Sequence, residues 1–394
     1  MPIDISRARA ETPGCDHVIH LNNAGAALMP QPVLDATIAH LQLEARIGGY
    51  EAARQVDDAV EQVYDDIARL IGAHRDEIAL FENATRAWDM AFYAIPFKAG
   101  DRILTSASEY ASNFIAFLQT AKKTGVEIAV VPNDEHGQIS LSALREAMDE
   151  RVKLIALTHV PTNGGLVNPA EEVGAIAREA GVLYLLDACQ SVGQLPIDVK
   201  AIGCDFLSAT GRKYLRGPRG TGFLYVSSEV LERLEPAMLD LHAASWTRSD
   251  RYELRSDARR FESWEASIAG RLGLGAAVRY ALDWGLDAIE ERVVQLAERL
   301  REGLSALAGV TVQDQGLRRC GIVSFTVDGH DPLALREALS AQGINLTTSS
   351  VGSTRLDMEA RHLAMVLRAS VHYYNEEREI EALVAALSRL ALPA

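Results

Sequence analysis

Asp187 and Gln190 follow an apolar segment that predicts a buried strand. The run VLYLL (182–186) precedes Asp187, and Gln190 lies three residues further along the chain. Open α/β sheets bind their ligands at the carboxyl ends of such strands. A carboxylate buried there needs a cation or a hydrogen-bond donor, because burial of an unpaired charge is costly. Asp187 therefore either binds a ligand or caps the turn that leads to the next helix.

A second group of reactive side chains surrounds Lys213. The segment SATGRKYLRGPRGTG (208–222) combines glycines with hydroxyl side chains, which lets a phosphate approach the backbone closely. A lysine amine in such a loop can form a Schiff base with a carbonyl compound once it is nucleophilic. The spacings match neither the P-loop nor the dinucleotide-binding fingerprint. Lys213 is therefore a candidate for covalent chemistry, and the alternative is an ordinary lysine in a surface turn.

These residues need a sheet that brings strand ends together. Four short apolar runs alternate with helical patterns, and they cover residues 126–131, 154–157, 182–188 and 223–226. One of the helices is marked by Asn168 as its N-cap, by Pro169 at its first position and by Gly181 at its end. Apolar strands that alternate with helices indicate a mostly parallel sheet covered on both faces. The strands at 126–131 and 154–157 are expected to be buried.

The pattern changes beyond about residue 280. Apolar residues from Ile289 to Leu307 form one long helical stripe, and GIVSFTV (321–327) reads as a strand. Further helices are expected near 332–341 and 376–391. We therefore expect a large α/β domain over 31–280 and a smaller α+β domain over 281–394.

The composition of the chain limits the classes of molecule that it is expected to bind. The chain has 394 residues, a net charge of −15 and 48% hydrophobic residues, as is typical of globular proteins. This acidity disfavours nucleic acid, because phosphate binding needs a basic face. No signal peptide or long apolar stretch is visible, so we expect no membrane segment and a cytoplasmic location. The cysteines are scattered, which argues against a disulfide framework and a metal site; they are Cys15, Cys189, Cys204 and Cys320.

Together, the Asp–Gln pair and the lysine loop resemble the class V aminotransferase family. These fold-type-I enzymes use pyridoxal 5′-phosphate (PLP), and they include cysteine desulfurases, selenocysteine lyases and isopenicillin N epimerase. Five further segments resemble the family's active-site motifs, in the right order: LNNAG (21–25), ENATRAWD (82–89), SEYASN (108–113), THVPTNGGLVNP (158–169) and VLRASVHYYN (366–375). The resemblance covers nearly the whole chain. It implies the fold-type-I PLP-dependent transferase fold, PLP as the cofactor, and an N-terminal arm over 1–30 that contributes to the active site.

The resemblance also implies a role for each matching residue. Lys213 would bind PLP covalently and move the Cα proton of the substrate. Asp187 would keep the pyridine nitrogen protonated so that the ring stores electrons, while Gln190 would bond the ring's 3′-oxygen and Tyr110 would stack on the ring. The other cofactor-binding residues, several of them around the phosphate at a helix N-terminus, are expected to be Ala84, Thr85, Arg86, Thr162, Thr210 and Arg212. The substrate-binding residues are expected to be Arg368 at the α-carboxylate, Asn23 and His372.

Departures from the family pattern narrow the reaction. Many desulfurases have a histidine over the ring, where this chain has Glu109-Tyr110-Ala111, and a catalytic cysteine in the loop that here reads TTSSVGSTRLD (347–357). The chain is most similar in pattern to C–S lyases of ergothioneine pathways, which act without such a cysteine. We therefore expect a C–S lyase that acts on an amino acid by β-elimination; the alternative is an aminotransferase or an epimerase.

The resemblance further implies a homodimer with a shared active site. The aromatic and arginine-rich segment 245–270 has the composition of interface anchors, although it could also be an ordinary surface loop.

Overall fold

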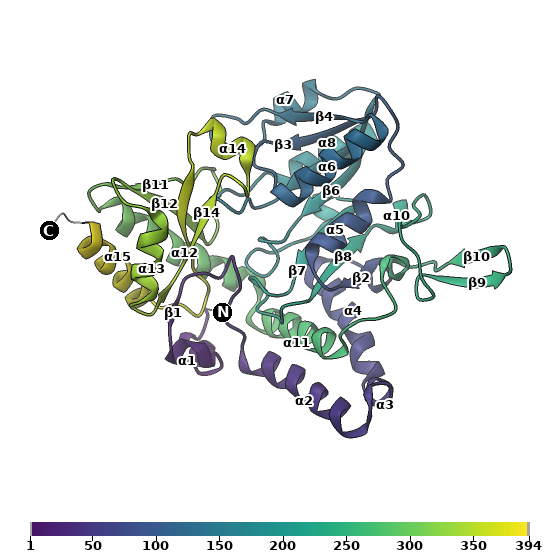
Figure 1. Ribbon diagram of the computed structural model, residues 1–394, viewed down its shortest axis with the longest axis horizontal. Coiled ribbons are helices and arrows are strands. Elements are labelled where there is room, and N and C mark those ends of the chain that lie inside the picture. The colour runs from purple at the N-terminus through teal and green to yellow at the C-terminus, as the bar shows by residue number, and fades with distance from the viewer. Residues whose placement is uncertain (1, 392–394) are drawn as a thin grey trace.

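The computed structural model describes residues 2–391. A seven-stranded sheet with the order β2-β8-β7-β6-β5-β3-β4 lies at its centre (Figure 1). All pairs from β7 to β4 are parallel, whereas β8 is antiparallel to both of its neighbours. The strands are β2 (Ile78–Phe81), β3 (Arg102–Ser106), β4 (Glu127–Val131), β5 (Val152–Thr158), β6 (Leu183–Asp187), β7 (Phe206–Thr210) and β8 (Gly222–Val226). The mostly parallel sheet expected from the sequence is confirmed.

Helices cover both faces of this sheet (Figure 1). Leu185 and Phe206 belong to one buried cluster, whereas Leu186 and Leu207, their neighbours along the same two strands, belong to another. This alternation follows from the two-residue period of a strand. The first face carries α5 (Ala84–Tyr93) and α6 (Ala111–Thr124), and the second carries α4 (Asp57–Ile71), α8 (Ala170–Ala180) and α11 (Ile268–Trp284).

A smaller antiparallel sheet has the order β11-β12-β15-β14. Its strands are β11 (Val310–Val312), β12 (Ile322–Val327), β14 (Thr347–Ser350) and β15 (Met365–Ser370). The accompanying helices are α12 (Leu286–Ser305), α13 (Pro332–Ser340) and α15 (Glu377–Ala391). The division of the chain into domains at residue 280 stays a prediction; that residue lies inside α11.

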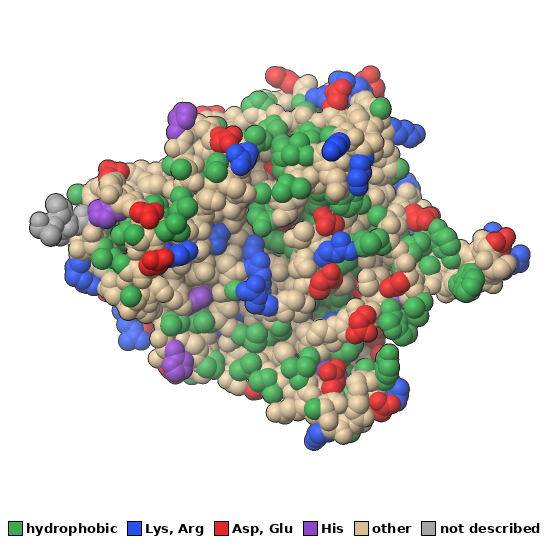
Figure 2. All heavy atoms as spheres, viewed as in Figure 1, with side chains coloured by type: hydrophobic (Ala, Val, Ile, Leu, Met, Phe, Trp, Pro, Cys, Tyr) green, Lys and Arg blue, Asp and Glu red, His purple; other side chains and the backbone are tan. Residues whose placement is uncertain are grey.

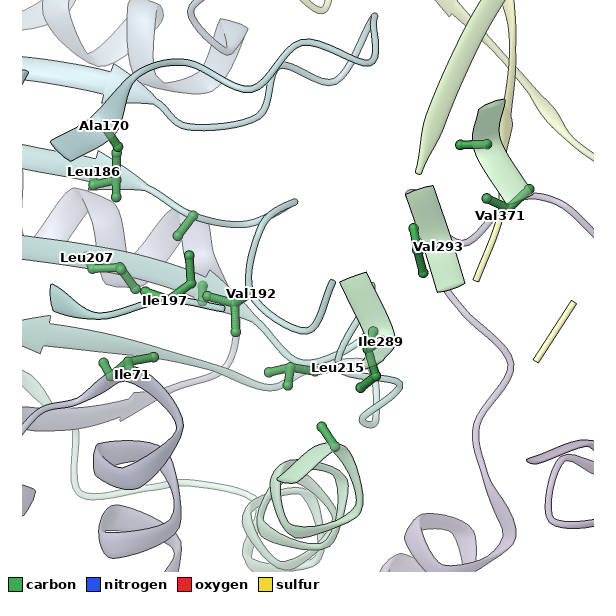
Figure 3. Close-up of a cluster of buried hydrophobic side chains, with 14 of the residues drawn as sticks. Ile71, Ala170, Leu186, Val192, Ile197, Leu207, Leu215, Ile289, Val293 and Val371 are labelled. Carbon is green, nitrogen blue, oxygen red and sulfur yellow. The ribbon is translucent and has the colours of Figure 1, made fainter. Parts of the chain in front are cut away.

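One hydrophobic cluster extends from the large sheet to the small one (Figure 3). Leu186 and Leu207 come from β6 and β7, Ile289 and Val293 come from α12, and Val371 follows β15. Each of these side chains is at most 1% exposed. The two parts of the molecule therefore share a core, and this core fixes the segments that lie between the two sheets.

The N-terminal segment begins with α1 (Ile5–Ala10), and β1 (Ile19–His20) then pairs in parallel with β13 (Ile344–Asn345). The helices α2 (Gln31–Ile47) and α3 (Gly49–Gln55) follow. Four large apolar side chains on α2 are exposed, Leu34 at 36%, Ile38 at 42%, Leu41 at 51% and Ile47 at 39%. Figure 2 shows hydrophobic side chains gathered over this lower edge of the molecule. The apolar stripe of α2 is thus not buried within the chain.

The remaining elements lie mostly at the surface. Figure 1 shows a hairpin of β9 (Ala244–Arg248) and β10 (Arg251–Leu254) that projects from the large part. The short helices are α7 (Leu141–Glu146), α9 (Val199–Ile202), α10 (Ser228–Leu231) and α14 (Arg355–Ala360), and the 3₁₀ turns are η1 (Pro13–Asp16), η2 (Arg75–Glu77) and η3 (Ala258–Phe261). None of the described helices has the length and apolar character needed to cross a membrane.

Two local expectations are wrong. The strand at 126–131 is not buried throughout, because β4 is an edge strand and leaves Glu127 and Val130 exposed. Asn168 is not an N-cap, since Pro169 takes that position in front of α8. The Asn168 amide instead donates to the Thr158 carbonyl at 2.8 Å and accepts from the backbone N–H of Ile139 at 3.1 Å.

Candidate active site

A pocket of about 490 Å³ lies where the carboxyl ends of the parallel strands meet. Thr158, Asp187 and Thr210 are the last residues of β5, β6 and β7, and all three line it. This is the edge of an open α/β sheet at which ligands bind. The other lining residues are Asn83, Ala84, Thr85, Tyr110, Val160, Thr162, Cys189, Gln190, Arg212 and Lys213.

Asp187 is buried, and each of its carboxylate oxygens accepts a hydrogen bond. Oδ1 accepts from the backbone N–H of Cys189 at 3.0 Å, and Oδ2 accepts from Nδ2 of Asn113 at 2.9 Å. These two bonds fix the orientation of the carboxylate at the end of β6. The turn-capping alternative is partly correct, since the bond to Cys189 is a local cap, but the second bond comes from a different helix.

Lys213 reaches the pocket from a tight loop between β7 and β8. The loop is closed by backbone bonds from Gly211 to the Thr221 carbonyl at 3.0 Å and from Gly217 to the Gly211 carbonyl at 2.7 Å. A Cβ atom on Gly211 would lie 2.2 Å from Thr221 Oγ1, so only glycine fits there. Burial lowers the pKa of Lys213, and the guanidinium group of Arg212 acts in the same direction. Lowering the pKa of a lysine makes its amine more nucleophilic.

Arg216 supports this loop from behind, and sequence reasoning did not identify it. Its guanidinium is buried and donates to the Leu28 carbonyl at 2.8 Å, to Tyr373 Oη at 2.6 Å and to Thr12 Oγ1 at 2.5 Å. Its backbone has φ 61°, a left-handed conformation that is unusual for a side chain of this size. The sequence carries no signal for these partners, which lie more than 150 positions away along the chain.

The N-terminus of α5 forms another wall of the pocket. Asn83 caps this helix by accepting the backbone N–H of Arg86 at 2.9 Å, while Ala84 and Thr85 line the pocket. A Cβ atom on Gly222 would lie 2.9 Å from the Asn83 carbonyl carbon, so glycine lets the helix start approach β8 closely. Arg86 does not line the pocket: Asn83 occupies its N–H, and its side chain lies 3.5 Å from Glu82.

Two polar side chains near the pocket have atoms without a partner among the described residues: Gln190 lines the pocket, whereas Arg368 does not line it and bonds the lining residue Thr162. The buried Gln190 donates to the Ala24 carbonyl at 3.1 Å, but its Oε1 accepts no bond. The buried Arg368 donates from Nη1 to the Thr162 carbonyl at 3.1 Å and also to the Thr162 hydroxyl, but its Nε is unpaired. Burial lowers the pKa of Arg368 to about 10. Since buried polar atoms are normally bonded, this wall is suited to an anionic or polar ligand.

Asn23 and His372 do not line the pocket. Asn23 donates to the Ser370 carbonyl at 2.7 Å and accepts from the Tyr374 hydroxyl. His372 is fully buried, and its two ring nitrogens meet the Tyr214 carbonyl at 3.0 Å and the backbone N–H of Tyr373 at 2.9 Å. Burial lowers the pKa of His372 well below its ordinary value. The polar atoms of both side chains therefore form hydrogen bonds within the chain.

Glu109 was noted in the sequence only as a departure from the family pattern, yet it is buried beside Asp187. Its Oε1 accepts from Asn113 Nδ2 at 2.8 Å, from the backbone N–H of Tyr110 at 2.9 Å and from the Thr158 hydroxyl. Burial, together with the nearby Asp187, raises the pKa of Glu109 to about 7. A signal was available, because Glu109 and Asn113 are four residues apart at a helix start, the spacing at which side chains meet.

Of the four cysteines, all within the described residues, only Cys189 lines the pocket. It is half-buried, and burial together with Asp187 raises the pKa of its thiol. Cys204 and Cys320 are buried, and burial raises the pKa of the half-buried Cys15 to about 11. The loop at 350–354, between β14 and α14, has no cysteine.

Comparisons with known proteins show the family and the fold of the chain. A probable cysteine desulfurase of Methanothermobacter thermautotrophicus is 32% identical over 385 residues, which cover 95% of each chain. The apo structure of a cysteine desulfurase from Thermococcus onnurineus has a TM-score of 0.92 at 28% identity and covers 99% of this chain and 98% of its own. The cystine C–S lyase C-DES, in complex with its product cysteine persulfide, shares the fold, with a TM-score of 0.87 at 24% identity and coverage of 96% and 99%. The profile of the family described as Aminotransferase class-V matches residues 19–383, and the chain therefore belongs to this PLP-dependent enzyme family.

Proposed function

We propose that this enzyme cleaves a C–S bond of an amino acid by β-elimination, with PLP held in the pocket and without a cysteine nucleophile. The pocket residues fit PLP. Lys213 offers an amine of lowered pKa, Gln190 offers an unpaired acceptor, and the N-terminus of α5 offers backbone N–H groups at Ala84 and Thr85.

PLP supplies an electron sink for the carbanion that forms at Cα of a bound amino acid. Asp187, fixed by two hydrogen bonds, would hold the protonated ring nitrogen, and Thr85, Thr210 and Arg212 would bind the phosphate. Tyr110 lines the pocket and is 37% exposed, so its ring is free to stack on a ligand.

The chain's own residues account for the remaining steps. Arg368 would hold the substrate carboxylate through its unpaired Nε and through Nη2, because Nη1 is already bonded to Thr162. Lys213 Nζ would take the proton from Cα, since burial favours the neutral amine. Loss of the Cα proton and breakage of the Cβ–S bond release the sulfur group, and water then completes the products pyruvate and ammonia.

One observation carries the choice of β-elimination over sulfur transfer to the protein. Transfer to a cysteine needs an accessible thiolate. The single pocket cysteine, Cys189, has a thiol whose pKa is raised, and its backbone N–H is bonded to Asp187. A desulfurase is the second candidate, because relatives with about 30% identity are described as probable cysteine desulfurases. The aminotransferase and epimerase alternatives keep the same PLP-binding residues.

The products distinguish these reactions. Purified enzyme is incubated with L-cysteine, L-cystine and S-substituted cysteines, and pyruvate, alanine and ammonia are quantified, with Lys213→Ala as the control. β-Elimination gives equal amounts of pyruvate and ammonia. Alanine with sulfur on a protein thiol would indicate a desulfurase instead. An amino acid formed from an added keto acid would indicate an aminotransferase.

We also propose that the enzyme works as a homodimer. The exposed apolar stripe of α2 and the exposed aromatic side chains of Trp246 (80%), Tyr252 (48%) and Trp264 (54%) have the composition of interface anchors. Tyr50 on α3 is also 71% exposed. Light scattering of the purified protein tests this: a mass of twice 42.8 kDa is expected, and a fully active monomer would contradict it.

A further inference from the structure

Two buried carboxylates lie on either side of one amide, and one of the two, Asp187, lines the pocket. Nδ2 of Asn113 donates to Glu109 Oε1 at 2.8 Å and to Asp187 Oδ2 at 2.9 Å. All three side chains are at most 6% exposed. The nitrogen of the amide, and not its oxygen, must face the two carboxylates, because an amide oxygen there would meet two acceptors.

The Glu109 carboxylate is held more rigidly than the Asp187 carboxylate. Besides Asn113, Glu109 accepts hydrogen bonds from the Thr105 hydroxyl at 3.1 Å, from the backbone N–H of Tyr110 at 2.9 Å and from the Thr158 hydroxyl. Thr105 and Thr158 belong to the neighbouring strands β3 and β5. Glu109 is therefore fixed by the sheet itself, and it fixes the amide of Asn113 in turn.

This arrangement is costly for stability alone. A second carboxylate is buried near Asp187 with no cation bonded to it, and its pKa is raised to about 7 by burial and by Asp187. Groups buried at such a cost cluster at functional sites. Without an acceptor at position 109, the Asn113 amide can rotate away, and Asp187 Oδ2 loses its donor.

We propose that Glu109 is a positioning residue that acts through Asn113 to fix the Asp187 carboxylate for the ring nitrogen of PLP; this rests on the proposed role of Asp187. Glu109 does not line the pocket, so it has no direct contact to offer the cofactor. Its influence on a ligand must therefore depend on what Asp187 contacts. The affinity for a ligand without a ring nitrogen should therefore not depend on Glu109.

The test is a binding titration of the PLP-free protein, followed by tryptophan fluorescence, with PLP and with its 1-deaza analogue, in which carbon replaces the ring nitrogen. Glu109→Ala is expected to weaken PLP binding by about tenfold or more, as when the partner of a metal ligand is removed, and to leave the analogue within about twofold. Asn113→Ala should behave alike. Glu109→Gln, whose side-chain oxygen still accepts from Asn113, should stay within about threefold for PLP.

Glu77→Gln is the matched control. Glu77 is also a buried glutamate, but it precedes β2 and bonds Ser228 at the opposite end of the sheet. The Glu77→Gln substitution should lower the stability of the protein without changing its affinity for PLP or for the 1-deaza analogue. Equal weakening of PLP and the analogue by Glu109→Ala, or no weakening of PLP, would overturn the proposal. If Glu109→Ala does not fold, Asn113→Ala and Glu109→Gln decide by the same criteria. A wrong role for Asp187 would give a different result from a wrong role for Glu109, because Asp187→Asn would then bind PLP as tightly as the parent.

Discussion

Replacement of Glu109 by glutamine removes a titratable group from behind the pocket wall and keeps the shape of the side chain. The amide oxygen still accepts from Asn113, Thr158 and the backbone of Tyr110, and the amide nitrogen faces the Thr105 hydroxyl, which can accept. The substitution therefore tests the charge of Glu109 with little change in packing. The groups that face it are Asp187, which raises its pKa, and the neutral Tyr184.

The pKa of Glu109 predicts how stability depends on pH. In the folded, PLP-free protein it is raised from 4.5 to about 7 by burial and by Asp187. Above pH 4.5 the unfolded chain loses this proton while the folded protein keeps it, so the free energy of unfolding falls as the pH rises towards 7. At about 1.4 kcal/mol per pKa unit, the loss is about 3 kcal/mol. Glutamine does not titrate, so the free energy of unfolding of the variant does not show this decrease.

The measurement is the melting temperature of PLP-free parent and variant at equal concentration between pH 4.5 and 8. An unfolding entropy of about 2 cal/mol/K per residue converts 3 kcal/mol to about 4 °C for a chain of this length. The melting temperature of the variant minus that of the parent should therefore increase by about 4 °C as the pH rises. Burial also raises the pKa of Asp205, to about 6, but this group is common to both proteins and cancels in the difference. A difference that stays constant within 1 °C would refute the reasoning.

Further predictions concern the cofactor, the substrate and the cysteines. Borohydride reduction and peptide mapping should find PLP on Lys213, and Lys213→Ala should abolish turnover with little change in melting temperature; PLP on another lysine would contradict the assignment. Gly222→Ala places a Cβ 2.7 Å from the Ala209 carbonyl and 3.1 Å from the Ala84 nitrogen, so PLP affinity should fall several-fold and stability by about 1–3 kcal/mol; unchanged binding would show that the start of α5 does not hold the phosphate. Arg368→Lys should raise KM at least tenfold with PLP affinity unchanged, because lysine cannot form the two-pronged bond to a carboxylate; an unchanged KM would remove Arg368 from the site. Replacement of all cysteines by alanine or serine should keep turnover within about tenfold in the folded, PLP-loaded enzyme, whereas loss of turnover on changing a single one would favour the desulfurase; the four are Cys15, Cys189, Cys204 and Cys320.

The sequence predicts the centre of the pocket because its determinants are local. Asp187 ends an apolar strand and Lys213 lies in a glycine-rich loop, and in a mostly parallel sheet the ends of neighbouring strands must meet. The substrate side was less predictable. Asn23 and His372 have the right chemistry, but the fold uses their polar atoms to bond backbone groups of other segments. Which side chains are consumed in this way depends on tertiary contacts, which a single sequence does not display.

The stripe on α2 illustrates a different limit. Apolar residues at helical spacing over 33–46 are typical of an amphipathic helix, but periodicity does not say what covers the apolar face. Leu34, Ile38 and Leu41 are exposed, whereas Val33 and His40 on the same helix are buried. The same pattern fits a core and an interface, since both bury apolar area.

Arg216 connects Lys213 and Arg368, the two residues proposed to act on the substrate. Lys213 is carried by the loop after β7, while Arg368 lies on β15 of the smaller sheet, so their separation depends on how the two parts pack. The guanidinium of Arg216 bonds Tyr373, five residues beyond Arg368, and its backbone N–H bonds the Lys213 carbonyl at 2.9 Å. Removal of one of these partners leaves a buried N–H donor of a charged group without an acceptor, at a cost of about 1–3 kcal/mol or more. The lysine loop and β15 are therefore joined by a residue that lines no part of the pocket, and the geometry of the reaction depends on packing that lies behind it.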